Sequence, residues 1–192
     1  MKEFIVASAS PRRKELLSGA GFDFRVEPSA CDETVDEGLS PEETVKELAE
    51  RKALSVLKKN PEGVVLGCDT VVALENVILG KPADSEDAFR MIKLLSGKRH
   101  KVCTGVCVAD SSRSESFVSV AEVEFYELSD ETAKSYVETG ECSDKAGAYG
   151  IQGFGGMLVK EIKGDYFSIV GLPLSESARC LASFGIYCKV KL

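Results

Sequence analysis

Two adjacent arginines stand where a loop of small residues is expected to enter a helix. The segment Ser8-Ala9-Ser10-Pro11-Arg12-Arg13 follows a short apolar run, and proline is typical of the first helical position. The free N–H groups and the positive dipole end of a helix start attract anions and disfavour arginine. Hydroxyls and guanidinium groups at such a place suit a phosphate-bearing ligand. A solvated helix start with two chance arginines is the alternative.

A carboxylate interrupts the most apolar segment of the chain. Residues 64–73 are apolar on both predicted faces except at Asp69 and Thr70. A carboxylate within a central strand requires a basic partner, a metal ion or a catalytic task. The ends of central strands in α/β folds often line ligand clefts. We therefore predict a functional role for Asp69, with pairing to a buried Arg or Lys as the structural alternative.

Two lysines and a glycine-rich segment extend this set. Lys52 belongs to a predicted long helix and Lys81 follows the strand after Asp69. Lysines bind phosphate oxygens as point charges, but each of these two also fits an ordinary surface position. Segment 147–156 is rich in glycine, which permits positive-φ turns and close approach of the backbone to a ligand. It lacks the Walker and Gly-x-Gly-x-x-Gly patterns, and a packed turn is the alternative. Its Gln152 amide can both donate to and accept from a base edge.

Together these residue types indicate phosphoryl chemistry. The sequence has one histidine, His100, so a zinc site built from histidines is not expected. A Ser-His-Asp mechanism would depend on His100 alone, and no Gly-x-Ser-x-Gly elbow is present. Cys103 and Cys107 share a face of a predicted strand, and we interpret them as small buried thiols in preference to a metal or redox pair. Carboxylates suit a hard cation such as Mg²⁺, which indicates metal-assisted chemistry on a small nucleotide.

Hydrophobic periodicity predicts an α/β fold with a mixed sheet. Ser40-Pro41-Glu42-Glu43 is a capping box that begins a long amphipathic helix. Strands are predicted at 4–8, 22–26, 64–73, 77–79 and 186–190, with hairpins formed by 102–109 with 114–126 and by 157–162 with 165–170. Helices are predicted at 12–20, 41–59, 85–95 (capped by Ser85), 129–140 and 173–184, and segments 27–40 and 144–156 are predicted to be irregular.

Composition limits the classes of partner. The 192 residues carry a net charge of -7, with 24 basic and 31 acidic side chains. Such a chain has no global field that attracts nucleic acid or anionic membrane. No apolar run approaches the length of a membrane span, and the N-terminal apolar stretch is too short for a signal peptide. With seven cysteines and no Cys-x-x-Cys pair, we expect a cytoplasmic protein.

Six motifs occur in the order found in a known family. They are the segment 7–17, Cys68-Asp69-Thr70-Val71-Val72, Gly80-Lys81-Pro82, Leu95-Ser96-Gly97, the segment 144–153 and Val170-Gly171-Leu172-Pro173. In this order they resemble the Maf-like nucleoside triphosphate pyrophosphatases, and the resemblance extends from about Phe4 to Phe184. The small departure is Cys68, where the family often has alanine. The Ile-Gln-Gly version of the glycine-rich segment is similar to the branch that acts on dTTP and UTP.

The resemblance implies both a fold and an activity. The fold is an inosine-triphosphatase-like α/β fold: one domain over residues 1–192, with an elongated mixed β-sheet, flanking helices and two lobes around a central cleft. The activity is hydrolysis of dTTP, UTP and some modified pyrimidine nucleotides to the monophosphate and pyrophosphate, with removal of non-standard nucleotides as its purpose. A homodimer is also implied. The alternative is a nucleotide-binding regulator of septum formation with little turnover.

Residue roles follow from the same resemblance. Asp69 is implied as the proton acceptor for the attacking water. The other implied positions are Arg12, Thr70 and Gln152 for substrate specificity, Ser8, Arg13, Lys52 and Lys81 for phosphate, and Glu33 with Asp69 for metal. The implied cofactor is a divalent cation, Mg²⁺ foremost, with Mn²⁺ or Co²⁺ as alternatives. The implied substrate is a nucleoside triphosphate, with no nucleic acid or membrane partner.

Overall fold

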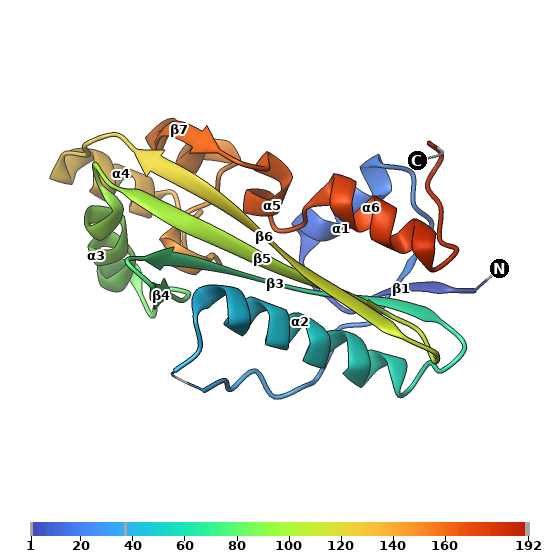
Figure 1. Ribbon diagram of the computed structural model, residues 1–192. Helices are drawn as coiled ribbons and strands as arrows, with labels where there is room; N and C mark the ends of the chain where they lie inside the picture. The colour runs from blue at the N-terminus through green and yellow to red at the C-terminus, as the bar shows by residue number, and fades with distance from the viewer. Residues whose placement is uncertain (1, 37, 191–192) are drawn as a thin grey trace.

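A seven-stranded mixed sheet organises residues 2–36 and 38–190, the part of the chain that the computed structural model describes (Figure 1). β1 runs parallel to β2 and β3, and the other pairs are antiparallel. The order is β2-β1-β3-β5-β6-β7, with β4 paired to β3. The strands are β1 (Phe4–Val6), β2 (Arg25–Val26), β3 (Val64–Leu74), β4 (Val77–Leu79), β5 (Arg99–Ala109), β6 (Ser114–Phe125) and β7 (Val159–Lys163).

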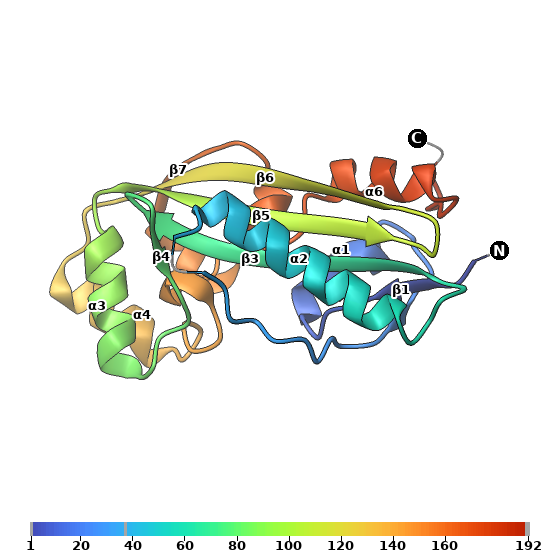
Figure 2. The same ribbon diagram turned by 60° about the horizontal axis from the view of Figure 1, so that its bottom comes forward.

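Helices cover both faces of this sheet. Helix α2 lies along one face of the long strands, α1 and α6 lie on the other, and α3 and α4 gather at the far end (Figures 1 and 2). Their bounds are α1 (Pro11–Gly19), α2 (Pro41–Leu57), α3 (Ser85–Leu95), α4 (Asp130–Glu138), α5 (Tyr166–Val170) and α6 (Leu174–Ser183), with 3₁₀ turns η1 (Ala146–Ala148) and η2 (Gly153–Leu158). Among the described residues, no helix is long and apolar enough to cross a membrane. The predicted α/β class is confirmed; the division into two lobes stays a prediction.

The side chains of β3 alternate between two hydrophobic cores. Val64, Leu66 and Cys68 pack with residues of α1 and α6, including Leu17 and Leu181. Val65 packs on the opposite face with alanines of α2. A strand has a period of two, so the same alternation directs Asp69 toward α2 and Thr70 toward α1.

Two glycines let α2 approach the sheet closely. A Cβ atom at Gly67 would lie 2.2 Å from the Ala49 carbonyl oxygen, and one at Gly105 would lie 2.2 Å from the Val45 carbonyl oxygen. Gly105 is also the register partner of Asp69 in the β3–β5 ladder. The helix backbone therefore rests on the strands beside Asp69, at the level where α2 carries Lys52.

The outer edge of β3 has a gap between its two short neighbours. β1 pairs with residues 64–66 of β3, and β4 pairs with residues 72–74. Within the described ranges no strand pairs with that edge at 67–71. The polar positions Asp69 and Thr70 lie in this gap, where the sheet is open on one side.

Two of the predicted strands are wrong. The segment 165–170 forms α5, because the Asp165 carboxylate caps a helix by accepting hydrogen bonds from Phe167 N at 3.0 Å and Ser168 N at 3.2 Å. The segment 186–190 forms no strand: after the turn at Gly185 (φ 82°), Ile186 N donates to the Leu181 carbonyl of α6.

Other predicted elements agree more closely with the structure. The capping box at Ser40 is confirmed, with Glu43 N donating to Ser40 Oγ and Ser40 N donating to Glu43 Oε2. The helix at 85–95 is present, but its N-cap is Asp84 and not Ser85. The strand predicted at 22–26 shortens to β2, and the irregular segment 144–156 contains η1 and the start of η2.

His100 belongs to the core at the α3–α4 end of the sheet. Its side chain is 2% exposed, and its Nε2 lies 2.8 Å from the Tyr149 hydroxyl. Phe125 packs edge-on against both rings. Burial lowers the pKa of His100 to about 4, so the imidazole is neutral at pH 7. This buried pair fixes Tyr149 at the start of the glycine-rich segment.

Replacement of Gly105 by alanine should destabilise the protein by about 3 kcal/mol, because the new methyl group meets the α2 backbone and not a movable side chain. Urea unfolding of G105A and the unchanged chain measures this. Gly19→Ala is the matched control, since no atom lies within 4 Å of a Cβ there. Equal unfolding midpoints for G105A and the unchanged chain would contradict the close packing of α2.

Stability should fall on acidification because of His100. Its pKa is about 4 in the folded chain and 6.5 in the unfolded chain, so the unfolded state binds more protons between these values. The free energy of unfolding should therefore drop by about 2 kcal/mol from about pH 7 to about pH 5.

Chemical denaturation across this pH range tests the assignment to His100. The variant His100→Gln should lose most of this pH dependence, whereas Tyr149→Phe should keep it while being less stable. A slope unchanged by H100Q would show that other groups cause the effect.

Candidate active site

A cavity of about 450 Å³ opens at the gap in the edge of β3. Its walls come from the loop before α1, from α2, β3 and the segment after β4, from the glycine-rich segment and from the turn after α5. All nine residues that the sequence singled out line it: Ser8, Arg12, Arg13, Glu33, Lys52, Asp69, Thr70, Lys81 and Gln152. Residues up to about 140 positions apart in the chain therefore meet at one place, although their roles are not thereby tested.

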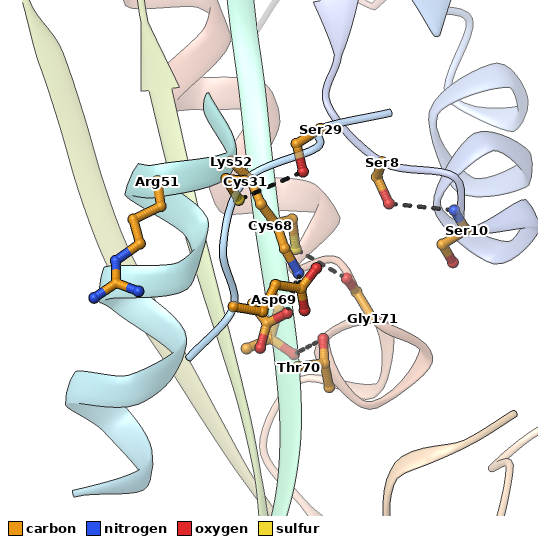
Figure 3. A network of polar contacts seen from close by, with 12 residues as sticks. Ser8, Ser10, Ser29, Cys31, Arg51, Lys52, Cys68, Asp69, Thr70 and Gly171 are labelled. Atoms are coloured by element: carbon orange, nitrogen blue, oxygen red, sulfur yellow. Dashed lines mark hydrogen bonds and ion pairs between the residues drawn. The ribbon is translucent and has the colours of Figure 1, made fainter. Parts of the chain in front are cut away.

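Lys52, which is buried, and Asp69, which is half-buried, form an ion pair in the wall of this cavity. Lys52 Nζ lies 2.6 Å from Asp69 Oδ1 and 3.2 Å from Glu33 Oε2. Burial lowers the pKa of Lys52, but the charges of Asp69 and Glu33 outweigh this, so the pKa lies above its ordinary value. Figure 3 shows Lys52 extending from α2 toward Asp69. The second Asp69 oxygen, Oδ2, forms no hydrogen bond with the described residues.

The Arg13 guanidinium is held from three sides. Its Nη1 donates to Ser8 Oγ at 3.0 Å, its Nη2 donates to Thr70 Oγ1 at 3.1 Å, and its Nε donates to the Gly171 carbonyl oxygen at 2.8 Å. Arg13 is thus rigidly oriented at the cavity wall, on the opposite face of β3 from Lys52.

The start of α1 is electropositive. Ser10 is the N-cap but its side chain makes no capping hydrogen bond, and no acidic residue lies in the first turn. Arg12 Nε is buried without a hydrogen-bond partner in the described part of the chain. A helix start of this kind, with its free N–H groups beside two arginines, is an anion-binding arrangement.

The cavity has a basic region and an apolar region. Basic side chains outnumber acidic ones along its wall, in a chain whose net charge is -7. Val72, Val102, Ile151 and Ile169 supply apolar surface, and the exposed Gln152 lies in the same wall. The arrangement suits a ligand with an anionic end and a flat polar-edged end.

An acidic residue that the sequence analysis missed anchors the glycine-rich segment. Glu141 accepts hydrogen bonds from Phe154 N at 2.9 Å and Gly155 N at 3.0 Å, and from the Tyr136 hydroxyl at 3.2 Å. Tyr136 in turn accepts from Gly150 N. Gly153 has φ 66°, and a Cβ there would lie 2.3 Å from Glu141 Oε2. The loop that carries Gln152 is therefore held by a carboxylate for which spacing gave no signal.

The available oxygen donors fit a hard divalent cation. Among the described residues no group of three or more His, Cys, Asp or Glu side chains is arranged to hold a metal. Glu33 and Asp69 contact the same Lys52 nitrogen, so their carboxylates are close together. Mg²⁺ is usually bound by one or two carboxylates together with phosphate oxygens and water. The donor set therefore fits a cation that enters with a phosphate ligand.

The histidine and the paired cysteines lie outside this chemistry. His100 is in the core with Tyr149, so it offers no base to the cavity. Cys103 and Cys107 are fully buried free thiols, and burial raises the pKa of each. This agrees with the expectation of small buried thiols.

Comparisons with known proteins give a consistent result. A family model described as Maf-like protein matches residues 3–184. The chain is 50% identical over 186 residues to a dTTP/UTP pyrophosphatase of Bacillus pumilus, covering 97% of this chain and 98% of that protein. It is 48% identical over 185 residues to the protein of the same name from Halalkalibacterium halodurans, covering 96% and 97%.

Solved structures with a similar fold have low sequence identity. The Staphylococcus aureus Ham1 protein has a TM-score of 0.51 and 15% identity, with 82% of this chain and 80% of that chain covered. A HAM1 protein from Coxiella burnetii has a TM-score of 0.52 and 14% identity, with 95% and 100% covered. At this identity the likeness shows the fold alone, and it agrees with the predicted elongated mixed sheet.

Proposed function

This chain belongs to the family of Maf-like proteins and is a dTTP/UTP pyrophosphatase, and we propose that Asp69 is the base of its reaction. The observation that carries the proposal is the Lys52–Asp69 pair at the open edge of β3, inside the one cavity that also contains both arginines. The enzyme hydrolyses the bond between the α- and β-phosphates and releases a monophosphate and pyrophosphate.

The basic region of the cavity binds the triphosphate. Arg12, Arg13 and the N–H groups at the start of α1 face the anionic chain, with Ser8 fixing Arg13 through its hydroxyl. Lys81 lines the cavity and forms no ion pair within the described residues, so its charge is available to a phosphate. These groups stabilise the negative charge that develops on the pyrophosphate leaving group.

Asp69 activates the water that attacks the α-phosphorus. Its Oδ1 accepts a hydrogen bond from Lys52, which keeps the carboxylate oriented, and its Oδ2 is available to accept a proton from water. The water oxygen bonds to the α-phosphorus as the bond to the bridging oxygen of the β-phosphate breaks. Lys52 thereby orients the base and also adds positive charge beside the phosphates.

Members of this family that hydrolyse nucleotides are generally metal-dependent, and we propose Mg²⁺ as the cation here, with Mn²⁺ or Co²⁺ as substitutes. Asp69 and Glu33 would hold it together with phosphate oxygens. When bound, such a cation neutralises charge on the triphosphate and polarises its phosphorus–oxygen bonds.

The apolar region and the glycine-rich segment select the base. Gln152 presents one amide donor and one acceptor, which match a uracil or thymine edge. Arg12 and Thr70, which line the same cavity, contribute to the same selectivity. The anchoring of residues 150–155 by Glu141 keeps Gln152 at a fixed distance from the phosphate-binding groups.

We also propose a cytoplasmic homodimer without nucleic-acid partners. The seven cysteines all lie in the described part and are free thiols, which is compatible with a reducing compartment. The net charge of -7 disfavours binding of polyanions, and basic side chains outnumber acidic ones along the cavity wall. The dimer rests on the family resemblance alone.

The variant Asp69→Asn should lower kcat for dTTP by about a hundredfold or more, because the amide cannot accept the proton from water. Its KM should change far less, since the phosphate-binding side chains remain. Pyrophosphate release under Mg²⁺ measures both constants. Asp23→Asn, at an exposed position without a hydrogen bond among the described residues, is the matched control. Full turnover by D69N would eliminate Asp69 as the base.

Removal of the Gln152 amide should weaken base selection. In Gln152→Ala, the ratio of kcat/KM for dTTP over that for GTP should fall by about tenfold, the value of one lost set of base contacts. Met157→Ala, at an exposed position in the adjoining 3₁₀ turn η2, should leave this ratio as it is. A preserved ratio in Q152A would assign base selection to other residues.

A further inference from the structure

A closed ring of hydrogen bonds links Arg13 to a residue that lies outside the cavity. Thr70 Oγ1 and Thr104 Oγ1 are 2.9 Å apart, and Thr104 Oγ1 donates to the Ser168 carbonyl oxygen at 2.8 Å. Arg13 joins the ring at both ends, through Thr70 Oγ1 and through the carbonyl oxygen of Gly171, which follows α5. Gly171 N donates to the same Ser168 carbonyl oxygen at 3.0 Å, which closes the ring. Thr104 itself is fully buried and does not line the cavity.

The direction of each hydrogen bond in this ring is determined. The Thr104 hydroxyl has one hydrogen, and the Ser168 carbonyl can only accept. Thr104 therefore donates that hydrogen to the Ser168 carbonyl oxygen. Thr70 must then donate to Thr104, and the Thr70 oxygen accepts from Arg13, which has no acceptor atom. The chain therefore runs from Arg13 through Thr70 and Thr104 to Ser168.

The sheet register creates this contact. Thr70 and Thr104 are direct partners in the β3–β5 ladder, so their side chains lie on the same face. That face packs against the core of α1 and α6. Cys68 and Val106 are the next register pair on the same face, and both belong to this core. A hydroxyl at position 104 is therefore a polar group within an apolar core. The ring of hydrogen bonds that it completes explains why a polar side chain stands there.

We propose that Thr104 is a positioning residue that orients Arg13 through Thr70, so that Arg13 binds the pyrophosphate portion of the substrate. The proposal rests on the phosphate-binding role of Arg13 given above. Of the five N–H hydrogens of Arg13, three are bonded to Ser8, Thr70 and Gly171, and two stay free for phosphate oxygens. Because the Thr70 hydrogen is engaged with Thr104, Thr70 influences substrate selection chiefly through Arg13.

The test is the affinity for inorganic pyrophosphate, measured by titration calorimetry, which needs no turnover. The variant Thr104→Val should weaken pyrophosphate binding about tenfold, because an isosteric methyl group removes the acceptor that fixes Thr70. Thr104→Ser should restore most of the affinity. In an Arg13→Lys background, T104V should cause no further loss. The KM for dTTP should rise in T104V.

Two further variants guard against misinterpretation. Thr44→Val replaces a buried threonine of α2 outside the ring, and it should keep the affinity. If T104V does not fold, Thr70→Val should show the same loss, since it removes the Thr70 oxygen that accepts from Arg13 while Thr104 keeps its bond to Ser168. Unchanged pyrophosphate affinity in folded T104V or T70V would overturn the proposal, as would an equal loss in T104S. A wild-type chain that binds pyrophosphate but does not hydrolyse dTTP would instead contradict the proposed function.

Discussion

The unequal lengths of the strands along one edge of β3 create the cavity. β1 pairs with β3 only up to residue 66 and β4 pairs with it only from residue 72, so on this edge the backbone between them has no strand neighbour among the described residues. Polar backbone groups on an open edge need water or a ligand as partner. In this gap the strand alternation directs Asp69 to one face and Thr70 to the other, and both still line one cavity. Asp69, the proposed base, and Thr70, which accepts a hydrogen bond from Arg13, are therefore neighbours in sequence but face different layers of the fold.

The ion pair of Lys52 and Asp69 depends on two residues without side chains. Burying a lysine is costly unless a carboxylate approaches it closely, and here the half-buried Asp69 lies 2.6 Å from the Lys52 nitrogen. That approach is possible because α2 rests on Gly67 and Gly105 with no side chain between helix and strands. A buried pair adds little net stability compared with apolar residues of the same size. Its presence beside the open edge is better explained by the reaction than by the fold.

Local sequence patterns predicted most helices and strands, but they did not identify every residue of the candidate site. The α2 capping box and the β5–β6 hairpin follow from signals within a few residues, so they were found from the sequence. The segment of α5 was mistaken for a strand because its residues are apolar and aromatic. It forms a helix because the Asp165 side chain caps the helix N-terminus. Residue types alone singled out Asp69 and the arginines. Glu33 stood in a loop without periodicity, and only the family resemblance pointed to it. Glu141 gave no signal, since its partners are backbone amides in a segment whose path depends on the whole fold.

The two ends of the substrate site belong to different cores joined by one rigid strand. The arginines extend from α1, which packs with α6 against one half of β3. Gln152 lies on a loop held by Glu141 and Tyr136, and Tyr136 belongs to the core of α3 and α4 at the other half. β3 contributes residues to both cores, so it sets the distance between phosphate and base chemistry. With the role proposed for Gln152, sequence changes within 150–155 alter which base fits while the Lys52–Asp69 pair and the ring around Arg13 keep their geometry.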